Sequence, residues 1–192
     1  GVQTCALPIY LPATRIIENP AIGTLLMTGV AIGMVVHSLR YRVQSLTALS
    51  FGCIYAALAL STMNTFVAAA LIPLAVAMLY LARRFEWHAT AVFSAACTYA
   101  VFLTRPASGA SLAAIQTMLV IFWTTFEAFD LIRLRSRQAA TEWSRVLFGL
   151  NAAAGLASSA ALWYRMAPDS MWIFCTGAAT LYLASKIGRA HV

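Results

Sequence analysis

The fold is decided by residues 21–62, which read AIGTLLMTGVAIGMVVHSLRYRVQSLTALSFGCIYAALALST. Two long apolar runs stand on either side of a short turn that contains Arg40, Tyr41 and Arg42. Neither run alternates apolar and polar residues with a period of two, as the strands of a membrane barrel do. About 20 apolar residues are enough to cross the hydrocarbon core as a helix. The stretch therefore predicts a hairpin of two membrane-spanning helices.

The same pattern continues along the chain. Apolar residues make up 61% of its 192 residues and charged residues only 10%, against roughly 25% charged in soluble domains. Only helices and closed barrels satisfy their backbone groups in a bilayer. We therefore predict an all-α transmembrane bundle of about seven spans, built from helical-hairpin repeats. The expected spans are residues 21–39, 46–62, 65–82, 88–104, 111–131, 146–164 and 171–185.

The arginines give the orientation. One side of the predicted membrane would hold Arg15, Arg105 and Arg165. The other side would hold Arg40, Arg42, Arg83, Arg84, Arg133, Arg135, Arg137 and Arg145. Because short loops rich in Lys and Arg stay in the cytoplasm, the arginine-rich turns are expected to be cytoplasmic basic loops. The N-terminal side of the first span is then outside.

The two ends of the chain look foreign to the gene. Residues 1–10 and 186–192 can be read from one DNA string and its reverse complement, which also supplies a stop codon after Val192. That string looks like a sequencing adapter, and such segments are excluded from fold reasoning. We expect the native segment to be residues 11–185, a fragment of a longer chain whose remaining transmembrane helices would pack beside it.

Without these ends, eleven arginines stand against six acidic residues. This modest basic balance does not indicate nucleic-acid binding. Cys53, Cys97 and Cys175 fall inside predicted spans without metal-ligand spacing. The sequence has no Gly-rich phosphate loop, no HExxH motif and no Ser-His-Asp set. We expect no metal, no cofactor and no nucleic-acid partner, with the lipid bilayer as the surroundings.

An internal repeat has a period of 44 residues. The shift places Arg40-Tyr41 on Arg84-Phe85, and Cys-Ile-Tyr-Ala at 53–56 on Cys-Thr-Tyr-Ala at 97–100. A weaker third copy repeats Glu86-Trp87 at 142–143. Equivalent helices would run the same way, which is typical of parallel repeats. Alternatively, Arg and aromatic residues simply collect at membrane interfaces.

These motifs resemble a known family. Residues 40–47 read RYRVQSLT and residues 83–87 read RRFEW. Over about residues 20–105 the chain resembles the bacterial predicted membrane proteins of domain-of-unknown-function family 2339 (DUF2339). The resemblance implies an interior slice of a long helical array in the bacterial cytoplasmic (inner) membrane. It implies no catalytic residues.

The fifth predicted span carries a candidate polar intramembrane face. At spacings of four, three, four and three, one helix face presents Gln116, Val120, Trp123, Glu127 and Asp130. Intramembrane carboxylates are costly and often mark ion or substrate paths. Asn151, at similar depth in the next span, is expected to hydrogen-bond Glu127. Alternatively, Asp130 pairs with Arg133 at the interface and Glu127 reaches toward water.

Small residues indicate possible helix packing. They recur at Gly29 and Gly33 in the first span, and at Gly149, Ala153, Ala157 and Ala161 in the sixth. Small ridges of this kind let two backbones approach closely. The alternative is that an Ala-rich composition produces such spacings by itself.

The function expected from these features is that of a non-enzymatic integral membrane protein of the cell envelope, with an unknown activity. One alternative is a transporter or channel subunit, which would use the polar face of the fifth span. A second is a membrane enzyme acting on a lipid-linked substrate, which would need several acidic or His residues on one membrane face.

The arginine bias predicts the topology. A reporter that is active only in the cytoplasm should be active when fused after Arg137 and silent after Ser108. Activity at both fusion points would mean that a span is miscounted, and the reverse pattern would invert the orientation.

Overall fold

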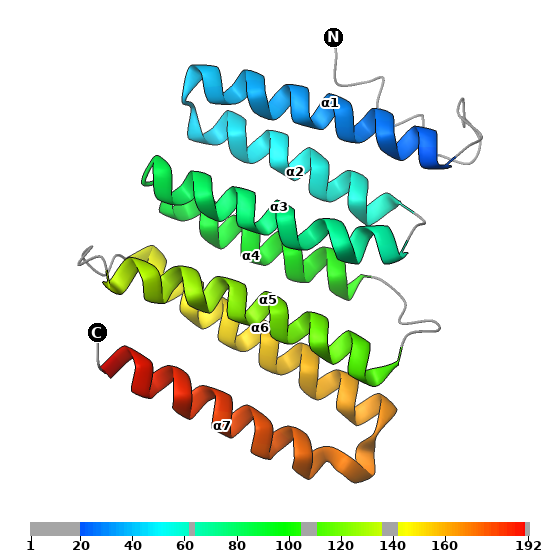
Figure 1. The fold of residues 1–192 in the computed structure, drawn as a ribbon, viewed down its shortest axis with the longest axis vertical. Helices are drawn as coiled ribbons and strands as arrows, with labels where there is room; N and C mark the ends of the chain where they lie inside the picture. Colours follow the sequence, from blue (N-terminus) through cyan, green and yellow to red (C-terminus); the bar gives the residue numbers. More distant parts are fainter. Residues whose placement is uncertain (1–19, 62–63, 105–110, 136–141, 191–192) are drawn as a thin grey trace. The chain divides into compact units, whose positions relative to one another are not determined.

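The computed structural model describes residues 20–61, 64–104, 111–135 and 142–190. Within these ranges the chain forms seven α-helices and no strand, which confirms the all-α prediction (Figure 1). It divides into two compact units, residues 1–69 and 70–192. The elements are α1 (Pro20–Tyr41), α2 (Gln44–Leu60), α3 (Asn64–Arg84), α4 (His88–Leu103), α5 (Leu112–Arg135), α6 (Glu142–Met166), the 3₁₀ turn η2 (Pro168–Ser170) and α7 (Met171–Ala190).

Three helical segments are long and apolar enough to cross a membrane: Val67–Arg84, Leu112–Arg135 and Glu142–Met166. The helices α2 and α4 are apolar but have only 17 and 16 residues. At 1.5 Å per residue they reach about 24–26 Å, slightly less than the roughly 30 Å hydrocarbon core. Both helices α5 and α6 extend four residues beyond their predicted cytoplasmic bounds.

The predicted adapter segments fall mostly outside the described residues, which exclude 1–19 and 191–192. The exception is the end of α7, which continues through residues 186–190. Lys, Ile, Arg and Ala tolerate or favour helix, so the segment extends the preceding turns although Gly188 disfavours helix. Lys186 and Ile187 are both exposed.

The unit formed by residues 1–69 contains the α1–α2 hairpin. One face of α2 is buried, with Thr47, Ser50, Phe51, Tyr55 and Leu58 recurring at helical spacing. The hydroxyls of Thr47 and Ser50 donate to backbone carbonyls four residues earlier, at 3.1 and 2.9 Å. These bonds let polar side chains lie in an apolar interface without losing a partner.

Two interhelical turns share one backbone conformation. Arg42 has φ 53° and Glu86 has φ 59°. They are separated by the 44 residues of the sequence repeat, and each stands two residues before a helix start. The starts of α1 and α3, at Pro20 and Asn64, differ by the same 44 residues.

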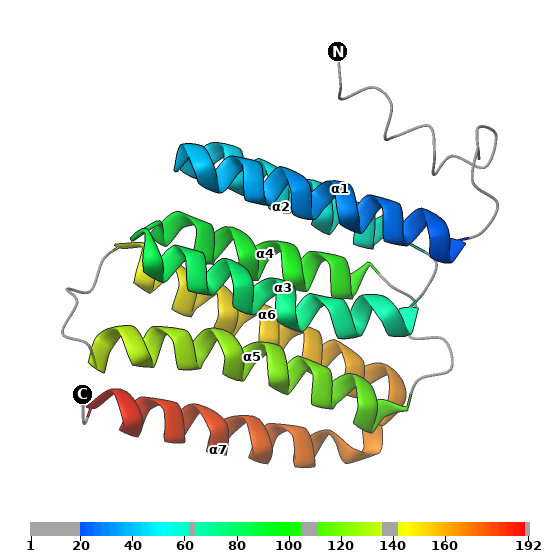
Figure 2. The ribbon, with the colours of Figure 1, turned by 45° about the horizontal axis from the view of Figure 1, so that its top comes forward.

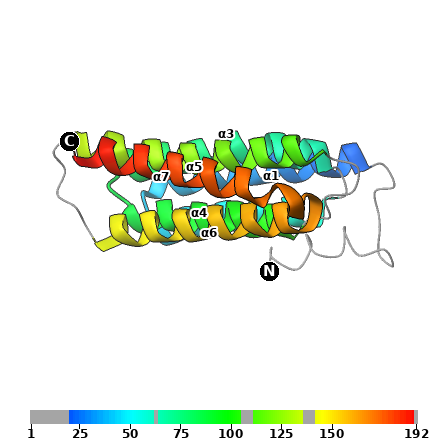
Figure 3. The same cartoon turned by 90° about the horizontal axis from the view of Figure 1, so that it is seen from below.

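In the unit formed by residues 70–192, α6 packs against α4, α5 and α7. Figure 3 shows α5 and α7 in one layer and α4 and α6 in the other, and in Figure 2 α7 follows the length of α5. Between α4 and α5, the Phe122 ring packs against the rings of Tyr99 and Phe102, with centroid distances of 6.4 and 5.2 Å and an interplanar angle of 80° in both pairs. Such T-shaped pairs are favourable aromatic arrangements.

The described helices expose apolar side chains and bury polar ones. Large apolar side chains with at least 54% exposure include Leu26, Val30, Ile32, Val36, Leu60, Tyr80 and Trp172. The buried polar side chains include Thr98, Glu127, Asp130, Arg133 and Asn151. Exposing these apolar side chains to water would be unfavourable. In a bilayer, apolar side chains can face the hydrocarbon, and polar groups need partners inside the protein.

The left-handed residues predict a stability change. Glu86→Gly should raise the free energy of unfolding by about 0.5–1 kcal/mol, because glycine adopts positive φ without the steric cost that other residues bear. Arg42→Gly should act in the same direction. Thermal unfolding in detergent would measure both. As a control, Ala77→Gly, at an exposed position inside α3, is expected to destabilise the protein by about 1 kcal/mol. A destabilising Glu86→Gly would contradict the prediction.

Candidate functional site: a polar column on α5

The C-terminal half of the predicted polar face of α5 is buried inside the unit and extends to Arg133, whereas Gln116, Val120 and Trp123 are half-buried. Glu127 is 5% exposed, Asp130 is 1% exposed and Arg133 is 4% exposed. They follow one another at intervals of three residues, so they lie along one side of the helix. We call these three residues the charged column. It runs from near the middle of α5 toward the C-terminal, predicted cytoplasmic end.

Glu127 points into the bundle. Its Oε1 accepts a hydrogen bond from Ser185 Oγ on α7. Its side chain is buried against neighbouring helices, which argues against the interpretation in which Glu127 reaches toward water. A charged or polar group in such a place is costly unless it is hydrogen-bonded.

Asn151 does not bond Glu127, so that expectation is wrong. Its Oδ1 accepts from Tyr99 Oη on α4 at 2.8 Å, and its Nδ2 donates to the Trp123 carbonyl on α5 at 3.0 Å. Asn151 is therefore shared between the two helices on which α6 packs. The amide uses a donor and an acceptor at once, which fixes the orientation of its side chain.

Arg133 belongs to the last turn of α5 and is buried, so its assignment to a cytoplasmic loop is wrong. Its Nη1 donates to His88 Nδ1 on α4 at 3.3 Å. Arginine has no acceptor, so this bond requires a lone pair on His88 Nδ1. One turn away, Ser144 Oγ of α6 donates to Asp130 Oδ1 at 2.5 Å.

The opposite end of the α5 face is held by neutral groups. Gln116 Nε2 donates to Ser159 Oγ on α6 at 3.2 Å. Gln116 Oε1 accepts from Trp163 Nε1, also on α6, at 3.2 Å. The face therefore changes from neutral amides and hydroxyls near the start of α5 to ionisable groups near its end.

The predicted packing stripes are not at close helix contacts. A Cβ placed on Gly29, Gly33 or Gly149 would meet nothing within 4 Å. The remaining members of the α6 stripe, Ala153, Ala157 and Ala161, are exposed. The stripe lies on the side of α6 that faces away from its neighbours, because the other side is occupied by Asn151 and the serines.

The close approach is at Gly155. A Cβ there would lie 3.2 Å from Trp123 Cδ1 and 3.4 Å from Tyr99 Oη. Spacing alone favoured the regular stripe of small residues over this single glycine. The sequence feature that points to Gly155 is its position one turn from Asn151, on the polar side of α6.

The predicted basic loop residues are otherwise peripheral. Exposed side chains are those of Arg40, Arg42, Arg83, Arg84 and Arg135, while Arg137 lies outside the described residues. Beside the α3–α4 turn, the Phe85 and Trp87 rings stack at 4.8 Å, with the Arg84 guanidinium 5.9 Å from the Phe85 centroid. Aromatic and basic side chains of this kind are typical of a membrane interface.

Several contributors to the site were not singled out from sequence: Tyr99, Ser144, Ser159, Trp163 and Ser185. Serine is common in Ala-rich helices, so nothing marks these serines before their neighbours are known. Arg133 had a signal, because it continues the spacing of Glu127 and Asp130 by three residues.

The charged column can hold, exchange or relay a proton, because its carboxylates contact hydroxyls that both donate and accept. Among the described residues, no group of three or more His, Cys, Asp or Glu side chains is arranged to hold a metal ion. Compared with known proteins, the chain matches no family model, no curated protein and no solved structure.

The Gly155 contact predicts a large difference between two glycines of α6. Gly155→Leu should destabilise the protein by about 1–3 kcal/mol, because the new side chain overlaps Trp123 and Tyr99. Gly149→Leu, with open space around it, should leave stability unchanged or slightly raised. Thermal unfolding in detergent would compare them, and equal effects would contradict the described packing.

Proposed function

We propose that this chain is a non-enzymatic, multi-pass integral membrane protein of the bacterial cytoplasmic membrane, with seven spans and the N-terminal side of the first span outside. The apolar exposed surface and the polar interior support a membrane location. The excess of arginine at one set of helix ends supports the orientation.

The hairpin repeat and the family resemblance belong to this proposal. The 44-residue period recurs in the helix starts and in the two left-handed turn residues, Arg42 and Glu86. A chain built by repeating a hairpin fits the long helical arrays that the resemblance to family 2339 implies. On this proposal, the native neighbours of these helices are further spans of the same longer chain.

Within this class, the activity that the geometry supports best is proton or cation movement along the polar face of α5. The observation that carries it is the burial of Glu127 and Asp130 inside the unit. A carboxylate at a membrane centre costs about 2.5–3.5 kcal/mol on insertion scales, and the cost is smaller toward the end of a span, where these two residues lie. Helices can associate through small residues and van der Waals contacts without that cost, so retaining two carboxylates favours a functional role.

The partners of the carboxylates suit proton movement. Ser185 and Ser144 hydrogen-bond Glu127 and Asp130 respectively, and a hydroxyl can accept one proton while it gives another. The three-residue intervals of the charged column correspond to rises of about 4.5 Å along the helix. On this proposal, the charged column forms the half of the proton path that lies next to the predicted cytoplasmic face.

The test is proton flux in liposomes that contain the purified protein and a pH-sensitive dye inside. Glu127→Gln should reduce the protein-dependent flux at least tenfold, because the amide keeps the shape but holds no exchangeable carboxyl proton. Asp130→Asn should act similarly.

The matched control is Glu142→Gln, the same change at an exposed position in the first turn of α6. It should leave the flux unchanged. Wild-type flux in the Glu127→Gln protein, or no flux above empty liposomes in the wild type, would reject the transport role and leave the charged column as a structural element.

A further inference from the structure

The contact between Arg133 and His88 lies at the predicted cytoplasmic end of the charged column. The Arg133 side chain is buried, and its Nη1 donates to His88 Nδ1 at 3.3 Å. His88 is half-buried at the first position of α4, and it lines one small hollow together with Asp130, Arg133 and Ser144. Because the other three side chains are buried, His88 is the member of this cluster that the surrounding pH reaches most directly.

Backbone hydrogen bonds fix the start of α4 on both sides of His88. The carbonyl of Glu86, the left-handed turn residue, accepts from His88 N at 3.1 Å. Trp87 N donates to the Ala82 carbonyl at 2.9 Å, and the Thr90 hydroxyl donates to the Trp87 carbonyl. A change in the contact between α4 and α5 therefore involves the side chains of His88 and Arg133 rather than this turn.

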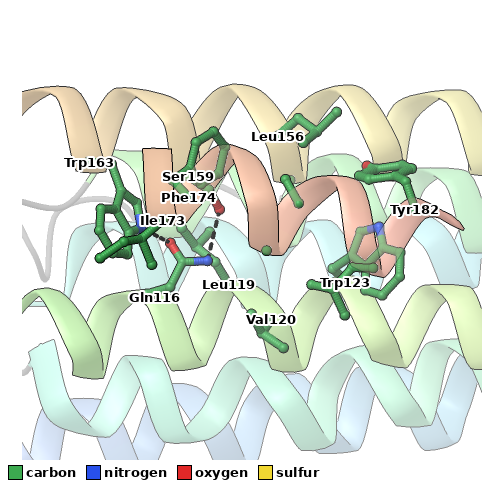
Figure 4. Close-up of a pocket in the computed structure, with 14 residues that line it drawn as sticks. Gln116, Leu119, Val120, Trp123, Leu156, Ser159, Trp163, Ile173, Phe174 and Tyr182 are labelled. Carbon is green, nitrogen blue, oxygen red and sulfur yellow. Dashed lines mark hydrogen bonds between the residues drawn. The ribbon is translucent and has the colours of Figure 1, made fainter. Parts of the chain in front are cut away.

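The neutral half of the α5 face borders a different kind of surface. Between Gln116 and Trp123 it meets a hollow among α5, α6 and α7, with mainly apolar walls (Figure 4). The described residues that line this hollow include no Asp, Glu, His, Lys or Arg. A side chain that exchanges protons near neutral pH is therefore found at the His88 end of the α5 face and not along this hollow.

The contact requires a neutral imidazole. Arginine only donates hydrogen bonds, so His88 Nδ1 must accept. Once the imidazole is protonated, both of its nitrogens carry hydrogen, so the bond to Arg133 is lost and two positive charges oppose each other at short distance.

The other charged groups around His88 come from two elements. Asp130 on α5 shares the hollow with His88, and Glu86 in the α3–α4 turn acts on it electrostatically. The side chains that α6 contributes to the hollow, Trp143, Ser144 and Leu147, are neutral. Both carboxylates stabilise the added positive charge, whereas Arg133 opposes it, so Arg133 is the group that protonation displaces.

We propose that His88 and Arg133 form a pH switch at the cytoplasmic end of the charged column. With a neutral imidazole, Arg133 stays over the hollow that contains Asp130. Protonation of His88 releases the guanidinium toward the membrane interface and gives water access to Asp130. Arg133 lies in the last turn of α5, where a long arginine side chain can reach the interface. The inference rests on the proposed proton path and adds its regulation by acidification.

Thermal unfolding in detergent tests the contact by itself. His88→Asn keeps an acceptor near the position of Nδ1 and does not gain a proton. The bond stabilises the wild type only while the imidazole is neutral. Between about pH 7.5 and 5.5, the unfolding temperature of the wild type should therefore fall by about 2–4 °C more than that of His88→Asn. Equal falls would overturn the proposal.

The matched control is His37→Asn, the same change at an exposed histidine near the end of α1. Its unfolding temperature should fall on acidification as that of the wild type does. A loss of the extra fall in His37→Asn would assign the pH dependence to the wrong histidine and would also overturn the proposal.

Proton flux in liposomes tests whether the contact controls the charged column. Equal pH on both sides and a potassium diffusion potential keep the driving force constant. His88→Ala removes the acceptor at every pH and serves as the open reference. The ratio of wild-type flux to His88→Ala flux should be about one-tenth or less at about pH 7.5 and approach one at about pH 5.5. His88→Asn should stay at about one-tenth at both values.

The two measurements separate the switch from the proposed function. A flux ratio that is the same at both pH values would overturn control of the charged column, even with the expected difference in unfolding. At about pH 5.5 the switch is open, so the flux lost in Glu127→Gln there reports on the path alone. If neither the wild type nor His88→Ala carries flux, the proton path is rejected, and the unfolding comparison still decides whether the contact is pH-sensitive.

Discussion

The interior of residues 70–192 is organised by one constraint: a polar group away from water needs a partner within the protein. Asn151 illustrates it, because its amide satisfies Tyr99 on α4 and a carbonyl on α5 together. Sliding α6 by one turn along α4 would break the first bond, and sliding it along α5 would break the second. These hydrogen bonds define the register of α6 against α4 and α5. The aromatic contacts of Phe122 and the close packing at Gly155 are compatible with that register.

The same constraint explains the neutral and charged halves of the α5 face. Gln116 and the indole of Trp163 satisfy each other near one end. At the other end, Arg133 and His88 lie close to where an interfacial water layer would begin on the proposed topology. The charged column is buried along its whole length, so its groups depend on partners such as Ser185, Ser144 and His88.

Hydropathy was sufficient to predict the helices, because each apolar run is long and most breaks are basic or contain Pro; the break at residues 61–63, Ser-Thr-Met, is recognised only by its polar residues. Periodicity also placed Glu127 and Asp130 on one side of α5, where both are buried. It did not give the rotation of α6 against its neighbours, since an Ala-rich helix has small residues on several sides. The partners Tyr99 and Ser185 lie 52 and 58 residues from the groups that they bond, and no local pattern encodes such pairs.

Chain order gives the Ser185–Glu127 bond a consequence for membrane insertion. Synthesis proceeds from α5 to α7, so Glu127 leaves the ribosome well before the serine that satisfies it. Until then, the carboxyl group must remain near the interface or use a temporary partner. The partner of Asp130 is synthesised much sooner, because Ser144 follows it by 14 residues. The order of synthesis thus couples the insertion of α5 to the later arrival of α7.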